Sequence, residues 1–363
     1  MEEVRTVLEA PPHQTPDPDE VVAAAMAWHF DPATGSPFWL RLAEKLPFTP
    51  QSDIRTVADL SRFPDLSAEL RTAAVADLVP RGCAGSGPPT VFESGGTTGP
   101  PKRVVDFGMA ERNLRWYQPV LDAHGFPAVG DWLYLGPTGP HLAGWSSHVL
   151  ARLRESTCFT VDLDPRWVKR RAAEGDQAGV DRYVDHILTQ AGWILETQDI
   201  AVLFATPPLL EGIAARDRLA ELAAANVRAV LWGGTSMDAE TRRLLSTEVF
   251  DGIPVVGVYG NTLMGAAPQR PGAPGDEDRC VFQPFEPYTH ITLVDEETGR
   301  PVDYGERGRV LLHRLDRDVF LPSVSERDTA VRMPPAAGFT GDGVADIRPV
   351  AAVGGTAVIE GVY

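Results

Sequence analysis

One short stretch, residues 93–102, reads Glu-Ser-Gly-Gly-Thr-Thr-Gly-Pro-Pro-Lys and combines three glycines, three hydroxyl side chains and a lysine. Predicted strands flank it, at 88–92 and 103–107. Glycines let the backbone reach positive φ angles and approach a ligand closely. Successive N–H groups in such a turn bind anions, and hydroxyls and a lysine complete a phosphate site. A surface turn requires neither paired threonines nor a lysine. The stretch therefore predicts a phosphate-binding loop between two strands.

Two common phosphate-binding motifs do not fit this loop. A P-loop NTPase needs Gly-Lys-Ser/Thr leading directly into a helix, whereas Lys102 lies between Pro101 and Arg103, ahead of a predicted strand. The dinucleotide-binding fingerprint needs Gly-x-Gly-x-x-Gly at the start of a helix. Neither class of nucleotide-binding protein is predicted.

Composition limits the partners of the chain. Its 363 residues, 43% of them hydrophobic, are enough for a large core and more than one subdomain. The 33 basic and 50 acidic residues give a net charge of −17, which argues against nucleic acid and anionic membranes as partners. The first residues, Met-Glu-Glu, do not predict a signal peptide, and no apolar run approaches the ~18 residues of a membrane span. The three cysteines are scattered, as in reduced proteins, so we expect a cytoplasmic protein.

Beyond the loop, predicted strands alternate with helices as far as residue 258. The strands are expected at 131–135, 158–162, 200–205, 227–232 and 254–258. This alternation predicts a parallel sheet covered by helices, with ligands at the carboxyl ends of its strands. Shorter strands and tight turns follow. We expect an α/β core over residues 1–265 and a β-rich subdomain over 266–363. Ser67 is expected to cap a helix reaching residue 77, and 165–192 to be one long helical stretch.

The loop resembles the phosphate-binding loop of the adenylate-forming (ANL) superfamily, which includes acyl-CoA synthetases, aryl-acid ligases, adenylation domains and luciferases. The residues that match its pattern are Ser94, Gly96, Thr97, Thr98, Gly99, Pro101 and Lys102. Gly95 stands where a second serine is usual. The resemblance implies a layered αβαβα core with mainly parallel sheets plus a small β subdomain. It also implies ATP and Mg²⁺ as cofactors.

Two later segments extend the resemblance in the same order. Gly233-Gly234-Thr235-Ser236 follows the strand predicted at 227–232, and Tyr259-Gly260-Asn261-Thr262 follows the strand at 254–258. In the family, the first segment passes beside adenine and the acyl group. The second supplies an aromatic ring against adenine and a threonine near the α-phosphate. The resemblance therefore implies nucleotide binding by both segments, with Thr262, Lys102 and His141 as the catalytic residues.

A third segment, Gly338-Phe339-Thr340-Gly341-Asp342, resembles the family's Tyr/Phe-x-Thr-Gly-Asp motif. Its aspartate accepts hydrogen bonds from both ribose hydroxyls, which implies that role for Asp342. Asp328 remains an alternative, because more divergent ligases end this region differently.

Pro140-His141-x-x-Gly144 resembles the family segment whose histidine or aromatic residue gates the acid pocket. Residues expected to contact the acid are His141, Trp145, Phe204, Gly233 and Ser236. A structural role for the histidine and core packing of the aromatic residues, Trp232 among them, are equally open explanations.

One departure affects the metal site. The family's Mg²⁺-binding glutamate is replaced by Leu263, and a leucine cannot ligate a cation that needs oxygen. The metal ligand is therefore unknown. Glu93 is one candidate, and phosphates with water are another. The chain also ends near the family's hinge, at 358–361, so the usual mobile C-terminal domain is expected to be lacking or to come from a separate partner.

The predicted function is ATP-dependent activation of a carboxylic acid to an acyl-adenylate, with an aromatic acid favoured over a fatty acid. The acceptor could be CoA, a carrier-protein thiol or an amine. A second reading is a nucleotide or acyl-adenylate binding module without turnover. A third is an unrelated nucleotide-binding α/β protein.

Overall fold

The computed structural model describes residues 1–96, 99–276, 279–350, 352–353 and 356–357. Thr97 and Thr98 of the predicted phosphate loop and the predicted hinge segment at 358–361 lie outside this part of the chain. The described chain forms two compact units. Unit 1 comprises 1–116, 262–266 and 283–347, and unit 2 comprises 117–261, 267–282 and 348–363. The units interleave along the sequence, and the expected division into 1–265 and 266–363 stays a prediction.

Unit 2 is built on the predicted parallel sheet, in which the strand order is β4-β3-β5-β6-β7-β8. The strands are β3 (Asp131–Gly136), β4 (Cys158–Asp162), β5 (Ile200–Ala205), β6 (Ala229–Gly233), β7 (Val255–Asn261) and β8 (Gly265–Pro268). The first five pair in parallel. Every residue of β5 and β6 is buried, as expected for central strands that are covered on both faces.

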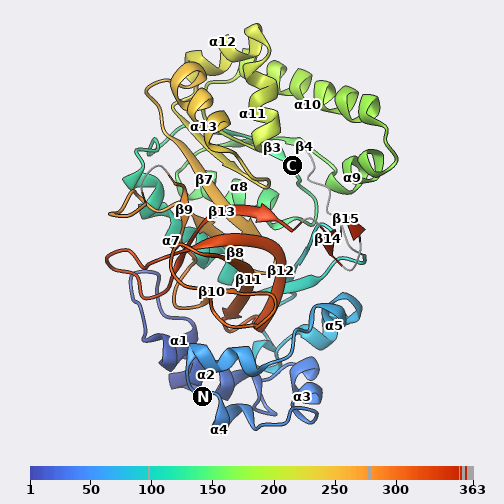
Figure 1. The fold of residues 1–363 in the computed structure, drawn as a ribbon, viewed down its shortest axis with the longest axis vertical. Coiled ribbons are helices and arrows are strands. Elements are labelled where there is room, and N and C mark those ends of the chain that lie inside the picture. Colours follow the sequence, from blue (N-terminus) through green and yellow to red (C-terminus); the bar gives the residue numbers. More distant parts are fainter. Residues whose placement is uncertain (97–98, 277–278, 351, 354–355, 358–363) are drawn as a thin grey trace. The chain divides into compact units, whose positions relative to one another are not determined.

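Helices connect the parallel strands. They are α8 (Leu142–Leu153), α9 (Pro165–Ala173), α10 (Gln177–Thr197), α11 (Pro207–Ala214), α12 (Asp217–Asn226), α13 (Ala239–Leu244) and the π-helical turn η3 (Leu245–Val249). Both α8 and α10 pack on β3 and β4 (Figure 1). The expectation of one helical stretch over 165–192 was wrong. Gly175, at φ +74°, ends α9, and the Asp176 carboxylate accepts the Gly179 N–H to begin α10.

The short remaining elements of unit 2 are β9 (Val281–Phe282) and the hairpin of β14 (Ala352–Val353) with β15 (Thr356–Ala357). Helix α7 (Met109–Ala123) begins in unit 1 and ends in unit 2. None of the helices among the described residues is both long and apolar enough to cross a membrane.

Short helices form the N-terminal part of unit 1 (Figure 1). They are α1 (Glu2–Leu8), α2 (Pro18–His29), α3 (Pro37–Ala43), α4 (Pro50–Asp53), η1 (Val57–Arg62), α5 (Ser67–Thr72), α6 (Val75–Leu78) and η2 (Arg81–Cys83). The prediction for Ser67 was wrong, because Leu66 is the N-cap residue and α5 ends at Thr72. The Ser67 hydroxyl instead donates to Asp65 Oδ1 at 2.7 Å.

An antiparallel sheet completes unit 1. Its first four strands are β10 (Thr289–Val294), β11 (Arg307–Leu315), β12 (Phe320–Met333) and β13 (Gly343–Pro349), paired in that order, and β9 is the fifth. The rings of His29, Phe30, Trp39 and Phe63 surround Phe320 at 4.7 to 5.5 Å. Phe320, at the start of β12, thereby joins the sheet to the core of the N-terminal helices.

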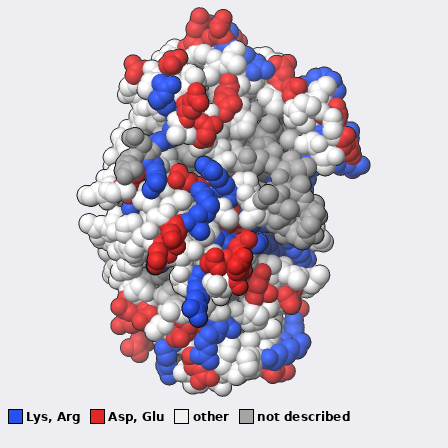
Figure 2. Space-filling view, viewed as in Figure 1, with Lys and Arg blue, Asp and Glu red and all other residues white. Residues whose placement is uncertain are grey.

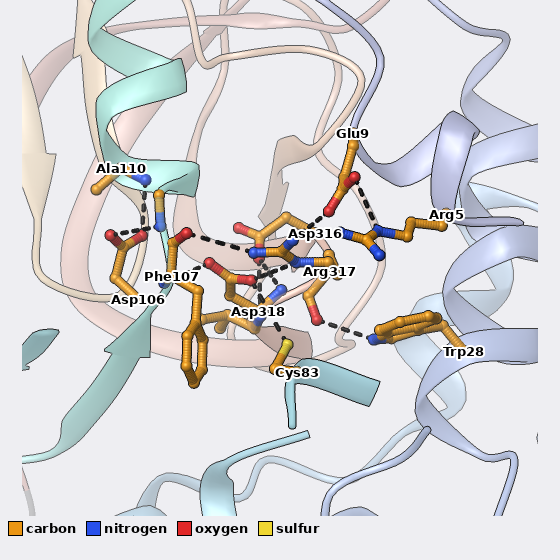
Figure 3. A network of polar contacts seen from close by, with 12 residues as sticks. Arg5, Glu9, Trp28, Cys83, Asp106, Phe107, Ala110, Asp316, Arg317 and Asp318 are labelled. Atoms are coloured by element: carbon orange, nitrogen blue, oxygen red, sulfur yellow. Dashed lines mark hydrogen bonds and ion pairs between the residues drawn. The ribbon is translucent and has the colours of Figure 1, made fainter. Parts of the chain in front are cut away.

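The turn between β11 and β12 carries a buried network of charged groups, which Figure 3 shows. Asp318 accepts hydrogen bonds from the Phe107 N–H at 2.6 Å and from Arg317 Nε at 2.8 Å. The Cys83 thiol also donates to Asp318, at 3.9 Å. Burial raises the pKa of Asp318 to about 6.

Helix α2 is attached to the same turn through its last two residues. Trp28 Nε1 donates to the carbonyl of Arg317 at 3.0 Å, and His29 Nε2 donates to the carbonyl of Asp316 at 2.8 Å. The network therefore fixes where β12 begins relative to the N-terminal helices.

Candidate functional site

The predicted phosphate loop closes an antiparallel hairpin of β1 (Thr90–Glu93) and β2 (Arg103–Asp106), which confirms the expected flanking strands. At its base, the Ser94 N–H donates to the Lys102 carbonyl and the Lys102 N–H donates to Ser94 Oγ, both at 2.9 Å. Gly96 and Gly99 have φ angles of +63° and +130°. The value at Gly99 strongly favours glycine, and anion binding by this turn stays a prediction.

Lys102 is partly buried where the loop meets α5. Its Nζ lies 3.4 Å from Ser67 Oγ and donates to it. Arg71 Nη1 donates to the carbonyl of Pro100 at 3.0 Å, which connects the loop to the same helix. Burial lowers the pKa of Lys102, while the charge of Glu326 opposes this effect. The amine is therefore held by neighbouring groups at the base of the loop.

Thr262 lies against the first residue of the loop segment. Its hydroxyl donates to the Glu93 carbonyl at 3.0 Å, although the two residues are 169 positions apart. The Leu263 side chain is only 2% exposed. The Glu93 carboxylate forms an ion pair with Arg103 Nε at 3.0 Å. The candidate metal ligand named from the sequence is thus already paired with a cation.

The carboxylate of Asp342 is bound by two side chains of unit 1. Tyr304 OH donates to Oδ1 at 3.0 Å, and Arg332 Nε donates to Oδ2 at 2.7 Å. The Arg332 guanidinium also lies over the Tyr304 ring, 4.4 Å from its centroid. A ribose at Asp342 would share its oxygens with these two donors or displace them.

Glu286 shapes the segment that precedes Asp342. Its Oε2 accepts the N–H and the hydroxyl of Thr340 at 2.8 and 2.9 Å. A Cβ atom at Gly341 would lie 2.6 Å from Glu286 Oε1, so this position requires glycine unless the glutamate moves. The Thr-Gly pair of the motif therefore has a structural reason that does not involve a ligand.

The alternative ribose acid, Asp328, lies in an irregular part of β12. Ser325 pairs with Leu311 and Thr329 pairs with Arg309, so residues 326–328 face a single residue of β11. This part of β12 also carries Glu326, a residue that the sequence motifs did not indicate. Burial raises the pKa of Glu326 to about 7, and the Lys102 charge lowers it in part. The only feature of the sequence that could have drawn attention to Glu326 is its place in the polar run Ser-Glu-Arg-Asp, which apolar residues precede.

In unit 2, the candidate residues follow the carboxyl ends of neighbouring parallel strands. A Cβ atom at Gly233, the last residue of β6, would lie 2.7 Å from the Val258 carbonyl oxygen. Gly234 follows with φ +90°. The turn therefore requires glycine at both positions. Thr235 has a buried Oγ1 with no hydrogen-bond partner among the described residues, and Ser236 is exposed.

Tyr259, Gly260 and Asn261 end β7. The Tyr259 ring is partly exposed and lies 6.2 Å from the ring of Phe282. Trp232 is buried against Gly257, where an added Cβ would lie 2.7 Å from the indole. Tyr259 has the exposure that a ring stacked on a base requires, whereas Trp232 packs inside the unit.

His141 precedes the first residue of α8 and is partly exposed, as is Trp145 one turn later. Both belong to the segment that follows β3. Phe204 is 8% exposed and contacts Tyr134, with ring centroids 4.9 Å apart. Of the residues expected at an acid pocket, His141, Trp145 and Ser236 are thus the accessible side chains.

Within the described part of the chain, the acidic side chains are spread out and do not form a metal cluster. No group of three histidine, cysteine or acidic side chains gathers there as a metal cluster. Acidic and basic side chains are interspersed on the face drawn in Figure 2. Among the described acidic side chains, Glu326 Oε1 is the buried carboxylate oxygen that has no hydrogen-bond partner.

No protein-family model and no curated protein matches the sequence. An open conformation of 2-hydroxyisobutyryl-CoA ligase in complex with 2-HIB-AMP and CoA is similar in structure, with a TM-score of 0.64 and 14% identity over 93% of this chain and 71% of that chain. The same ligase in the postadenylation state in complex with R3-HIB-AMP has a TM-score of 0.62 and 14% sequence identity. This match covers 87% of this chain and 62% of that chain. ATP-bound MatB from Rhodopseudomonas palustris has a TM-score of 0.44 and 17% sequence identity, and the match covers 70% of this chain and 47% of that chain.

The similarity to the two 2-hydroxyisobutyryl-CoA ligase structures confirms the predicted α/β fold with a parallel-dominated sheet and additional antiparallel strands. This chain spans between 62% and 71% of the two ligase structures with the higher TM-scores. It therefore shares the fold of 2-hydroxyisobutyryl-CoA ligase.

Proposed function

We propose that this chain activates a carboxylic acid with ATP, forming an acyl-adenylate and pyrophosphate. The observation that carries the proposal is the hairpin loop of residues 94–102. It presents glycines at positive φ and a lysine held at its base, and the Thr262 hydroxyl lies on the adjoining Glu93 carbonyl. The fold, which matches ligases determined with acyl-adenylates, supports the assignment.

In the proposed reaction, an oxygen of the substrate carboxylate attacks the α-phosphorus of ATP. The bond from that phosphorus to the oxygen of the leaving pyrophosphate breaks. The protein contributes positioning and charge stabilisation rather than covalent chemistry. Lys102 and the N–H groups of the loop would hold phosphate oxygens, with Ser94 fixing the loop base. Thr262 would donate to the α-phosphate or the acyl carbonyl. Bound Mg²⁺ would neutralise phosphate charge.

The remaining roles rest on the sequence resemblance and on the local geometry of each unit. Tyr259 and the Gly233-Gly234 turn are proposed for adenine, and Asp342 for ribose. Asp328 is kept as the alternative for ribose because Asp342 already accepts from two side chains. His141 is proposed to contact the acid, since it is accessible and precedes a helix N-terminus.

For the substrate we propose an aromatic acid, with a fatty acid as the alternative, and CoA as the acceptor. CoA is supported by its presence in the similar 2-hydroxyisobutyryl-CoA ligase structure. The test is pyrophosphate release from ATP and Mg²⁺ across benzoates, hydroxybenzoates, aminobenzoates, short hydroxy acids and fatty acids, with acyl-AMP detected by mass spectrometry. Acyl-AMP from one acid class would support the function and name the substrate.

Lys102→Ala tests the role of the loop, and Lys45→Ala is the matched control because Lys45 is an exposed lysine of the same unit. We expect Lys102→Ala to weaken binding of ATP more than binding of AMP, since the lysine is proposed to bind the distal phosphates. An unchanged ratio of the two affinities, with Lys45→Ala also unchanged, would contradict the assignment.

A nucleotide-binding module without turnover is the second candidate, favoured by the buried apolar side chain at Leu263. Leu263→Glu restores the family's residue. A large gain in pyrophosphate release would indicate a catalyst weakened at its metal site. Acyl-AMP formation by the unaltered protein at rates typical of enzymes would reject the non-catalytic candidate.

A further inference from the structure

One side-chain carboxylate oxygen that interacts electrostatically with Lys102 of the phosphate loop is buried without a hydrogen-bond partner in the described part of the chain. Glu326 Oε1 has no hydrogen-bond partner among the residues that the structure describes. Burying an acidic oxygen without a partner costs free energy, so such an atom in a folded protein calls for an explanation. A proton, a water or an ion bound at that oxygen would supply one.

The backbone of β12 holds Glu326 in a specific place. Between the pairs Ser325–Leu311 and Thr329–Arg309, β12 contains two more residues than β11. The bulged backbone is nevertheless satisfied at Glu326, whose carbonyl accepts from Arg309 Nε at 3.0 Å. Bulges often redirect side chains beside functional sites. The extra residues therefore form an ordered feature of the strand rather than a loose loop.

The charged groups that act on Glu326 include Lys102 of the phosphate loop, together with Asp328, Arg327 and Asp65. The charge of Glu326 acts on Lys102, and the charge of Asp65 acts on both groups. Ser67 connects Lys102 with Asp65, because its hydroxyl accepts from Lys102 Nζ at 3.4 Å and donates to Asp65 Oδ1 at 2.7 Å. Phosphates bound at Lys102 would add negative charge beside a carboxylate. A divalent cation between carboxylate and phosphate would remove the resulting repulsion.

We propose that Glu326 binds the divalent cation that accompanies ATP at the phosphate loop. This inference rests on the proposed ATP-dependent function. The Leu263 side chain has no oxygen, its backbone carbonyl accepts from Arg314 Nη1 at 3.1 Å, and Glu93 is paired with Arg103 at 3.0 Å. Magnesium in nucleotide sites is held by one or two carboxylates together with phosphates and waters, so no larger cluster of protein ligands is required.

The test compares ATP binding by calorimetry in excess Mg²⁺ and in EDTA, for the wild-type chain, Glu326→Gln and Glu297→Gln. Glu297 is exposed on the turn after β10, so its variant controls for the lost negative charge. In Glu326→Gln we expect the gain in ATP affinity from Mg²⁺ to fall by at least roughly tenfold. Affinity in EDTA should stay the same or rise, since the repulsive charge is gone.

The other outcomes overturn the inference in distinguishable ways. An unchanged Mg²⁺ gain in Glu326→Gln would remove the residue from the metal site. If Glu326→Gln raises ATP affinity equally in Mg²⁺ and in EDTA, Glu326 is only a counter-charge for Lys102. If the variant lowers both affinities equally, the role of Glu326 is structural. If the wild-type chain binds ATP in neither condition, the proposed function fails together with the inference.

Discussion

His29 provides a quantitative test of the core of unit 1. The ring is 1% exposed and stacks on Phe320, with centroids 5.2 Å apart. Its Nε2 donates to the Asp316 carbonyl at 2.8 Å, and its Nδ1 is buried without a partner among the described residues. This arrangement suits a neutral imidazole. Burial lowers the pKa of His29 to about 4, although the hydrogen bond to Asp316 and the charge of Asp316 oppose the shift.

The sign and size of the effect on stability follow from linkage. The unfolded chain protonates His29 near pH ~6.5, whereas the folded chain resists protonation until about pH 4. The neutral histidine therefore contributes stability that is fully present above pH ~6.5 and is lost as the pH falls through that window. Between pH 7 and pH 5 the loss is about 2 kcal/mol.

His29→Gln isolates this contribution, because a glutamine amide can still donate to the Asp316 carbonyl but does not titrate. The free energy of unfolding would be measured by urea denaturation at pH 7, 6 and 5, with fluorescence and circular dichroism required to coincide. Other buried groups, including His313 and Asp318, titrate in the same range. The informative quantity is thus the difference between the two proteins. We expect the variant to lose about 2 kcal/mol less than the wild type. Parallel curves would refute a buried neutral His29.

Two further predictions concern single side chains. Burial raises the pKa of Cys83 to about 12, so iodoacetamide at pH 8 should label this thiol at least about a thousandfold more slowly in the native protein than in urea; rapid native labelling, seen by peptide mass spectrometry, would contradict the buried thiol. Asp342→Asn should weaken ATP binding roughly tenfold or more while leaving pyrophosphate binding unchanged, because a hydrogen bond to a charged group is lost. If Asp328→Asn weakens ATP binding in this way and Asp342→Asn does not, Asp328 is the residue that binds the ribose.

Much of the parallel sheet could be predicted because its strands are short apolar runs between helices. The run at 200–205 became β5 at the same residues. Strand β12 was not predicted. Pro322 lies at a register irregularity, between the pairs Leu312–Val324 and Arg314–Leu321. Proline in a strand is tolerated mainly at edges and bulges, so the local sequence argues against the long strand that tertiary pairing creates.

The candidate site was predictable to a similar, partial degree. The flanking strands of the phosphate loop followed from local pattern. The contact of Thr262 with the Glu93 carbonyl joins residues 169 positions apart and was not predicted. The family resemblance implied only that Thr262 lies near the α-phosphate. Glu326 carries no motif. Its significance depends on burial and on the neighbouring charge of Lys102, which are properties of the folded unit and not of the local sequence.

Strand β12 links three parts of unit 1 that the proposed function needs. Its first residue, Phe320, sits in the aromatic core with His29, its middle carries Glu326, and near its end Arg332 binds the Asp342 carboxylate. The two extra residues of the bulge are an even number, so they keep the alternation of faces on either side. Removing one residue from the bulge would rotate Arg332 to the opposite face while leaving Phe320 in place. The integrity of the phosphate and Asp342 regions thus depends on this one strand, whose register is fixed by the N-terminal helices at one end.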